Sequence, residues 1–395
     1  MKQKLVIVLG ILFFISCQKP QEQTSNFEVA YNVNVETYFL AELLAVKYRK
    51  TNSQWENHKL STCQEYQPIV KLALNRFDTA DNADFAKSTA IFCDTLVSYG
   101  YGNDIIMPIL LQLPDFSKHK KPGKFKLPDL QMAPQKKKEL TALISQYLDK
   151  LYQFYTQKNV GHFIKENLGF YTGAINEIKA AVPADFTQAM EHYYGEKRHR
   201  YVALVSPMEI WPIEENVGRG ISATVEKENG KTVYEVMSPF VQVPINASHS
   251  YNSYGFDYEG TARFLTIHEF SHSFVNPALE GYRARIESSS NLFTDTLKEK
   301  MASKGITNWN IYVIESFVRL GEIRIAAIQK DKEREKQLRK YHTETEYFIF
   351  LPQLEKSILE FENNRQKYPE WQEYIPKLLE VFENSNPEFV NNALQ

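Results

Sequence analysis

The sequence predicts an α+β fold, in which a mostly helical chain carries one small antiparallel sheet. Apolar residues recur at helical spacing through the first third of the chain and again after Thr307. Between these parts lies a short region of β-branched and aromatic residues with one Asn-Gly turn signal, which is typical of a hairpin. We therefore expect helical N- and C-terminal parts on either side of a small sheet.

The first residues indicate an export signal. Two lysines precede an apolar run from Leu5 to Ile15, which is shorter than the roughly 20 residues that span a bilayer. Ser-Cys17 then resembles a bacterial lipobox, in which the cysteine is lipidated, with a plain secretory signal as the alternative. We assign residues 1–17 to a lipoprotein signal peptide with lipobox Cys17, and residues 18–26 to a flexible tether. The protein is then exported and lipid-anchored in the bacterial cell envelope, on its periplasmic or outer-surface face.

Charge and cysteine usage narrow the class of partner. The chain has 46 basic and 48 acidic residues, without a long basic stretch interleaved with aromatics, so nucleic acid is not an expected partner. Cys63 and Cys93 are an even number in an exported protein, and a disulfide and two buried free thiols explain them equally well. Neither has a CxxC partner, and a cysteine-based zinc site is not expected.

Three long helical stretches are predicted in the N-terminal part, over residues 28–50, 69–99 and 135–157, from their apolar spacing. A Lys- and Pro-rich connector precedes the third stretch, and we interpret it as a solvated loop. Another helical stretch ends near His192. Residues 27–195 are therefore assigned to a mostly helical N-terminal region.

The residue pattern then changes from helical spacing to strand-like runs. Residues 221–227 and 231–237 flank Asn229-Gly230, and Asn-Gly suits the two positive φ angles of a type I′ turn. These two runs are expected to pair as an antiparallel hairpin. The predicted catalytic region, residues 196–330, contains this hairpin and the helix that follows it, and residues 331–395 form a helical C-terminal region.

The stretch HEFSH places His268, Glu269 and His272 on that helix. Histidines at i and i+4 lie one above the other, which brings two imidazoles to the same metal ion, with the glutamate beside it. Neutral imidazoles bind zinc, and a catalytic zinc lowers the pKa of its bound water toward about 7. We predict Zn²⁺ ligation by the two histidines and activation of the zinc-bound water by Glu269. The alternative is an ordinary helix with satisfied polar residues, and Pro277 is expected to end this helix after Asn276.

A third protein ligand is expected on a later helix. Glu315 lies in the middle of a segment that is apolar on almost every side, and a buried carboxylate needs a metal or a cation. Arg319, one turn later, would satisfy it without any metal. We favour Glu315 as the ligand, with Glu322 and Glu280 as alternatives.

With HEFSH on one helix and Glu315 on a later one, the sequence resembles the gluzincin class of zinc metallopeptidases. It departs from the thermolysin-type second motif, Asn-Glu-x-x-Ser-Asp, because Ile314 and Arg319 stand where that motif has Asn and Asp. The aspartate that would orient a ligand histidine is thus missing. The lipoprotein start, HEFSHSFVNP and ESFVR also resemble a bacterial lipoprotein family described as domain of unknown function 4932. That resemblance covers about half of the chain and implies a zincin-like peptidase fold without a substrate.

The resemblance to zincins implies further parts of a site. Zincins place an antiparallel edge strand above the metal, along which an extended peptide pairs, and the hairpin is the best candidate for it. An oxyanion needs a Tyr, His or Arg that faces the zinc, and the residues considered as transition-state or substrate contacts are Arg319, His249 and Tyr254. The other histidines, such as His58, His119 and His342, are assigned to the surface.

The sequence therefore predicts a membrane-tethered zinc metallopeptidase that acts on a peptide or protein substrate, with a membrane partner through its N-terminal lipid. The alternative is a non-catalytic envelope lipoprotein that uses a zincin-like scaffold to bind a protein or cell-wall component. Hydrolysis of a non-peptide substrate by the same chemistry also fits the motif.

Overall fold

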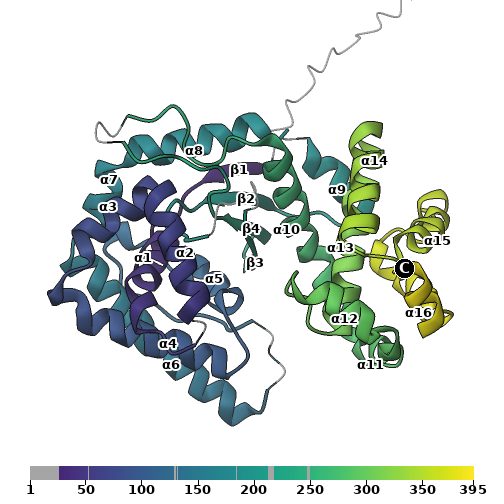
Figure 1. Ribbon diagram of the computed structural model, residues 1–395, viewed down its shortest axis with the longest axis horizontal. Helices are drawn as coiled ribbons and strands as arrows, with labels where there is room; N and C mark the ends of the chain where they lie inside the picture. The colour runs from purple at the N-terminus through teal and green to yellow at the C-terminus, as the bar shows by residue number, and fades with distance from the viewer. Residues whose placement is uncertain are drawn as a thin grey trace, which may run out of the picture.

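The computed structural model describes residues 26–395 except residues 52, 129, 131, 184, 212–217 and 247–249. The predicted signal peptide, Cys17 and nearly all of the tether lie outside these residues. The described chain is mostly helical with one four-stranded sheet (Figure 1), which confirms the α+β class. No helix among the described residues is long and apolar enough to span a membrane.

The strands and N-terminal helices have the following bounds. The strands are β1 (Phe27–Ala30), β2 (Arg200–Val205), β3 (Gly220–Lys227) and β4 (Gly230–Met237). The helices before β2 are α1 (Val33–Ala45), α2 (Ser53–Tyr66), α3 (Pro68–Phe77), α4 (Ala83–Ser98), α5 (Asn103–Gln112), α6 (Pro134–Gln157), α7 (Val160–Glu166), α8 (Leu168–Ala181) and α9 (Phe186–Tyr194). The predicted stretch 69–99 is thus two helices, α3 and α4, with a break between them.

The remaining helices follow the sheet in sequence. They are α10 (Glu259–Leu279), α11 (Arg283–Glu287), α12 (Asp295–Ala302), α13 (Trp309–Ile328), α14 (Lys332–Lys340), α15 (Leu351–Asn363), α16 (Ile375–Glu383) and α17 (Pro387–Ala393), with a π-helical turn, η6 (Tyr341–Thr345), directly after α14. The predicted helical C-terminal part is confirmed.

The sheet is mixed, so the prediction of a small antiparallel sheet is correct only for the hairpin. Its order is β1-β2-β4-β3, where β1 and β4 both pair with β2 in parallel and β3 pairs with β4 antiparallel. The start of the predicted helix 28–50 is strand β1, whose Phe27 pairs with Tyr201. That partner is distant in sequence, and local apolar spacing cannot reveal it.

The hairpin turn differs from the predicted type I′ turn. Gly230 has a φ of +110°, but Asn229 does not have a positive φ, whereas type I′ needs both. The register pairs Lys227 with Gly230. Glu228 and Asn229 are therefore the two loop residues, and the glycine takes the left-handed conformation directly after them, where it costs least.

Helices cover both faces of the sheet (Figure 1). On one face, Tyr201 and Val233 pack with residues of α10 and α13; on the other, Val202 and Tyr234 pack with residues of α1 and α5. The first core also contains apolar residues of α15 and α16, so it extends across the predicted boundary at residue 330. Cys63 and Cys93 are buried free thiols.

Helix α10 does not end at Asn276 as predicted, because it continues through Pro277 to Leu279. A proline in a helix leaves the carbonyl four residues earlier without its N–H donor. Here that carbonyl, of Ser273, accepts a hydrogen bond from the buried Arg198 guanidinium at 2.8 Å. The guanidinium also lies 3.8 Å from the Phe274 ring centroid. Arg198 thus replaces the missing backbone donor and keeps the last turn of the helix in place.

A buried carboxyl group makes the stability of the fold depend on pH. Burial raises the pKa of Glu209 to about 8, and within the described residues neither of its oxygens has a hydrogen-bond partner. Because the pKa is higher in the folded state, the free energy of unfolding falls as pH rises from the usual value of 4.5 to about 8, and it falls no further above that. Between about pH 5 and pH 9, the wild type should lose on the order of a few kcal/mol of unfolding free energy relative to Glu209→Gln.

Urea unfolding of both proteins across that pH range measures this difference. Glu228→Gln, at the exposed hairpin turn, is the matched control and should follow the wild type. Parallel pH profiles for wild type and Glu209→Gln would contradict the assignment.

Candidate metal centre

The predicted ligands come from two helices that pack against each other, α10 and α13. Asn308 is the N-cap of helix α13, and its side chain accepts a hydrogen bond from the Ile311 N–H at 3.0 Å. One face of α10 carries the two histidines, and α13 presents Glu315 toward them. The packing of two apolar helices therefore brings the three polar side chains together.

His268, His272 and Glu315 converge on one point. The two imidazole Nε2 atoms are 3.2 Å apart, and the Glu315 oxygens lie 3.6 Å from Nε2 of His268 and 3.4 Å from Nε2 of His272. One ligand atom from each residue lies within 4.8 Å of the others, so this group could hold a metal ion. The three predicted ligands are thus placed together, which no local feature of the sequence required.

The other ring nitrogen of each histidine faces an oxygen. Nδ1 of His268 is 2.9 Å from Glu322 Oε1, and Nδ1 of His272 is 3.1 Å from Asn276 Oδ1. A proton on Nδ1 of each ring would give both oxygens a donor, while Nδ1 of His268 also contacts Arg319 Nη1. Both Nε2 atoms then present lone pairs to each other and to the Glu315 carboxylate. Acceptors packed this closely need a proton or a metal cation between them, and two imidazoles with one carboxylate are a donor set that suits a divalent transition metal.

Electrostatics favour an ionised carboxylate at this point. Burial alone would raise the pKa of Glu315, but His272, His268 and Arg319 outweigh it and hold the pKa below its usual range. Burial likewise opposes ionisation of Glu322, yet His342 and Arg319 hold its pKa well below the usual value. Both carboxylates are therefore charged at neutral pH.

Glu269 lies between α10 and the edge strand β3. Glu269 is buried, with 8% of its surface exposed. Gly220 begins β3 so close to it that a Cβ there would lie 2.6 Å from Glu269 Oε1. A larger residue at this position would force the Glu269 side chain to move. The predicted water-activating carboxylate and the predicted edge strand are thus in direct contact.

The outer edge of β3 has backbone groups that do not pair with β4. The Ser238 N–H donates to the Arg219 carbonyl at 2.9 Å, so these residues form a hydrogen-bonded pair. In an antiparallel ladder such pairs alternate with non-bonded pairs, so the N–H and C=O of Gly220 and Ser222 point away from β4. Among the described strands, β3 is at the edge of the sheet. A peptide strand could pair there next to Glu269.

A second carboxyl group approaches Glu269 from the sheet. Glu235 of β4 is fully buried, and in the described part of the chain neither of its oxygens has a hydrogen-bond partner. Burial, and then the charge of Glu269, raises its pKa well above the usual value. Burial and the charge of Glu269 therefore both favour the neutral form of Glu235.

Of the three residues predicted as transition-state or substrate contacts, Arg319 lies next to the candidate metal centre. Arg319 is held by Glu346 at 3.0 Å and Glu322 at 3.1 Å, with its guanidinium 5.3 Å from the ring centroids of both Phe264 and Phe348. Its Nη1 also contacts His268 Nδ1 and lies 3.7 Å from Glu315 Oε2, so Arg319 borders two of the predicted ligands.

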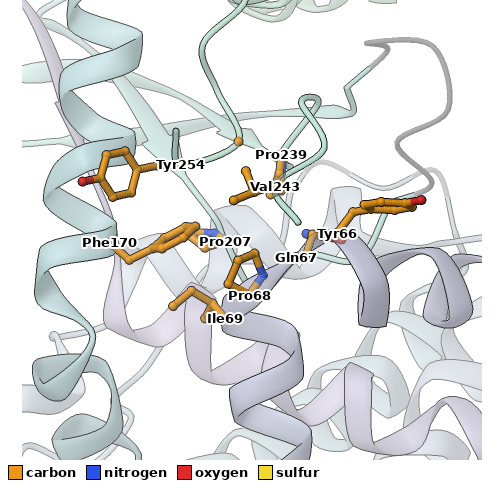
Figure 2. Close-up of a pocket in the computed structure, with 10 residues that line it drawn as sticks. Tyr66, Gln67, Pro68, Ile69, Phe170, Pro207, Pro239, Val243 and Tyr254 are labelled. Carbon is orange, nitrogen blue, oxygen red and sulfur yellow. The ribbon is translucent and has the colours of Figure 1, made fainter. Parts of the chain in front are cut away.

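The other two predicted contacts, Tyr254 and His249, are not placed at the metal centre by the described part of the chain. Tyr254 packs edge-on against Phe170, 5.2 Å between ring centroids, and covers Gly173 of α8. Figure 2 shows this ring beside Phe170 in a small pocket. Its position is explained by packing. His249 lies outside the described residues.

The assignment of His342 to the surface is wrong. His342 is 0% exposed, and its Nε2 lies 2.8 Å from Glu322 Oε2. Glu322, weighed as an alternative ligand, instead contacts Nδ1 of His268 with one oxygen and Nε2 of His342 with the other. Glu280, the other alternative, pairs with Arg283 at 3.5 Å and is not part of the group. The burial of Glu322 in an apolar helix was visible in the sequence, but its partner in a charged segment was not.

Comparison with known proteins identifies a family for this chain but no activity. A family model described as Domain of unknown function (DUF4932) matches residues 129–381. No curated protein and no solved structure matches the chain. The matched segment contains the three candidate ligands, Glu269, and the buried partners Glu322 and His342.

Proposed function

The chain belongs to the family described as Domain of unknown function (DUF4932), a description that names no activity, and we propose that it is a zinc-dependent metallopeptidase. The observation that carries this proposal is the convergence of His268, His272 and Glu315, with Glu269 next to His268 on α10 and close to the start of the edge strand β3. Two imidazoles and one carboxylate are the ligand set of many catalytic zinc sites. The site thus supplies both a metal position and a base.

The chemistry divides between the ion and the chain. Zinc held by these three residues would act as a Lewis acid and lower the pKa of a bound water toward about 7. Glu269 would take the proton of the attacking water and give it to the leaving amine, as a general base and then a general acid. Its position beside His268 on the same helix supports this role.

The edge strand supports a peptide as the substrate class. The N–H and C=O of Gly220 and Ser222 point outward, and an extended peptide can pair with such an edge through its backbone. This pairing would hold the scissile bond close to Glu269, because Gly220 contacts that carboxylate. A non-peptide substrate would make no use of these backbone groups. We further propose that the enzyme acts at the cell envelope, with a lipid on Cys17 as its membrane anchor.

The test measures zinc content and peptide cleavage of the purified protein. Elemental analysis should find close to one zinc per chain, and mass spectrometry of a peptide mixture should show cleavage that a chelator stops and added zinc restores. A folded protein that takes up no zinc on reconstitution contradicts the proposal. Zinc uptake without cleavage of any peptide would leave a metal-binding envelope protein instead of a peptidase.

A further inference from the structure

A buried ring of four side chains lies behind the candidate metal centre. Glu322 Oε2 is 2.8 Å from His342 Nε2, and His342 Nδ1 is 3.4 Å from Glu346 Oε2. Glu346 Oε2 is 3.0 Å from Arg319 Nε, and Arg319 closes the ring to Glu322 Oε1 at 3.1 Å. Glu322 is also the acceptor for Nδ1 of His268. The ring therefore connects to the centre through Glu322 and through Arg319, whose Nη1 contacts His268 Nδ1 and lies 3.7 Å from Glu315 Oε2.

The ring joins two parts of the chain. Arg319 and Glu322 come from α13, whereas His342 and Glu346 follow α14, in and directly after the π-helical turn η6. The wide turn is closed by a hydrogen bond from the Glu346 N–H to the Tyr341 carbonyl at 3.0 Å, five residues back. Such π-helical turns are rare and occur often at functional sites. Here the turn brings two titratable side chains to the same face of α13.

Stability alone is a poor explanation for this arrangement. Taking ionised groups out of water costs free energy that their attraction only partly returns, and well-packed apolar residues are often as stable. The histidine is 0% exposed, and Glu322 and Arg319 have little exposure. What the ring does provide is a single orientation for the Glu322 carboxylate, because each of its oxygens has its own donor, His342 on Oε2 and Arg319 on Oε1.

We propose that His342 is a positioning residue of the metal centre and acts through Glu322 on His268. With His342 and Arg319 holding Glu322, the carboxylate stays in position to accept the Nδ1 proton of His268, so that Nε2 remains free for the metal ion. The C-terminal helical part is then needed for metal binding, although it supplies no ligand. This inference rests on the metal site of the proposed function, but not on peptide hydrolysis.

The test compares zinc affinity, by competition with a chromophoric chelator, in wild type, His342→Leu and His342→Gln. Leucine removes the donor to Glu322, and the affinity should fall about 10- to 100-fold, as for other lost partners of metal ligands. Glutamine keeps an N–H donor near the Nε2 position and should restore affinity to within a few-fold of the wild type. His162→Leu is the matched control, since His162 is half-exposed and pairs with Glu166 on the surface.

The visible absorption of the Co²⁺-loaded proteins gives a second readout. A changed His268 position should alter the cobalt bands in His342→Leu but not in His342→Gln, which a general loss of packing would not do. If His342→Leu does not fold, His342→Asn, whose shorter amide does not reach the Nε2 position, should weaken zinc binding with the same change of bands.

The outcomes separate this inference from the proposed function. Wild-type affinity and spectrum in a folded His342→Leu protein, or in His342→Asn where leucine prevents folding, would overturn the role of His342 and leave the peptidase proposal intact. A wild type that binds neither ion would overturn both. Weakened zinc binding in a protein that still cleaves peptides when saturated with zinc supports the role.

Discussion

Glu269→Gln protein is expected to bind one zinc ion per chain and to hydrolyse peptides about 10²- to 10⁴-fold more slowly than the wild type. This range is the usual contribution of a general acid–base residue. Glutamine has the same shape as glutamate but cannot take the proton of water. Glu269 is not one of the three residues whose ligand atoms converge, so the metal should remain. The kcat/KM for a cleaved peptide, measured beside zinc content, checks both parts.

The matched control is Glu259→Gln, because Glu259 lies at the exposed start of the same helix. Its kcat/KM should stay within a few-fold of the wild type. Loss of zinc from Glu269→Gln would show that this carboxylate is a ligand. Unchanged hydrolysis with zinc retained would show that another group takes the proton, and the role given to Glu269 would be wrong.

Glu315→Ala is expected to lose zinc binding by more than about 100-fold, beyond the loss typical of a partner behind a ligand. The variant removes one of three ligand atoms and leaves two imidazole Nε2 atoms 3.2 Å apart. Peptide cleavage should disappear with the metal. Chelator competition and elemental analysis of the purified variant measure the loss.

Variants of two other glutamates, Glu322 and Glu280, show whether the loss of zinc is specific to Glu315. Glu322→Gln keeps the three ligands and should weaken zinc binding by about 10- to 100-fold. Glu280→Ala changes an exposed carboxylate paired with Arg283 and should bind zinc like the wild type. A Glu315→Ala protein with wild-type zinc content, beside a Glu322→Gln protein without zinc, would exchange the roles of these two carboxylates.

Much of the fold follows from the sequence, because helices carry their signal locally. The apolar spacing of residues 135–157 predicts α6 to within a residue at its start, and Asn-Gly locates the hairpin. Strand β1 could not be predicted in this way. Its pairing with β2 depends on a segment far along the chain, and so does the parallel pairing of β2 with β4.

The candidate site was predictable where a motif or a buried charge exposes it. HEFSH gives His268, Glu269 and His272, and an acidic residue within an apolar helix gives Glu315. His342 was not predictable, because it follows a charged helix and is buried through a π-helical turn. Tyr254 fits a local aromatic pattern, but its ring fills space against α8. The roles of His342 and Tyr254 depend on the direction in which each side chain points, which the residue type does not reveal.

Gly220 determines how much room the Glu269 side chain has. A carboxylate that first receives a proton from water and then delivers it to a nitrogen must serve two points in turn, so it needs freedom to shift. The absence of a side chain at Gly220 provides that clearance on the sheet side. The same residue also limits the freedom, because the strand backbone itself forms the wall. In the proposed mechanism, the start of β3 would therefore limit how far the Glu269 carboxylate can move toward the sheet.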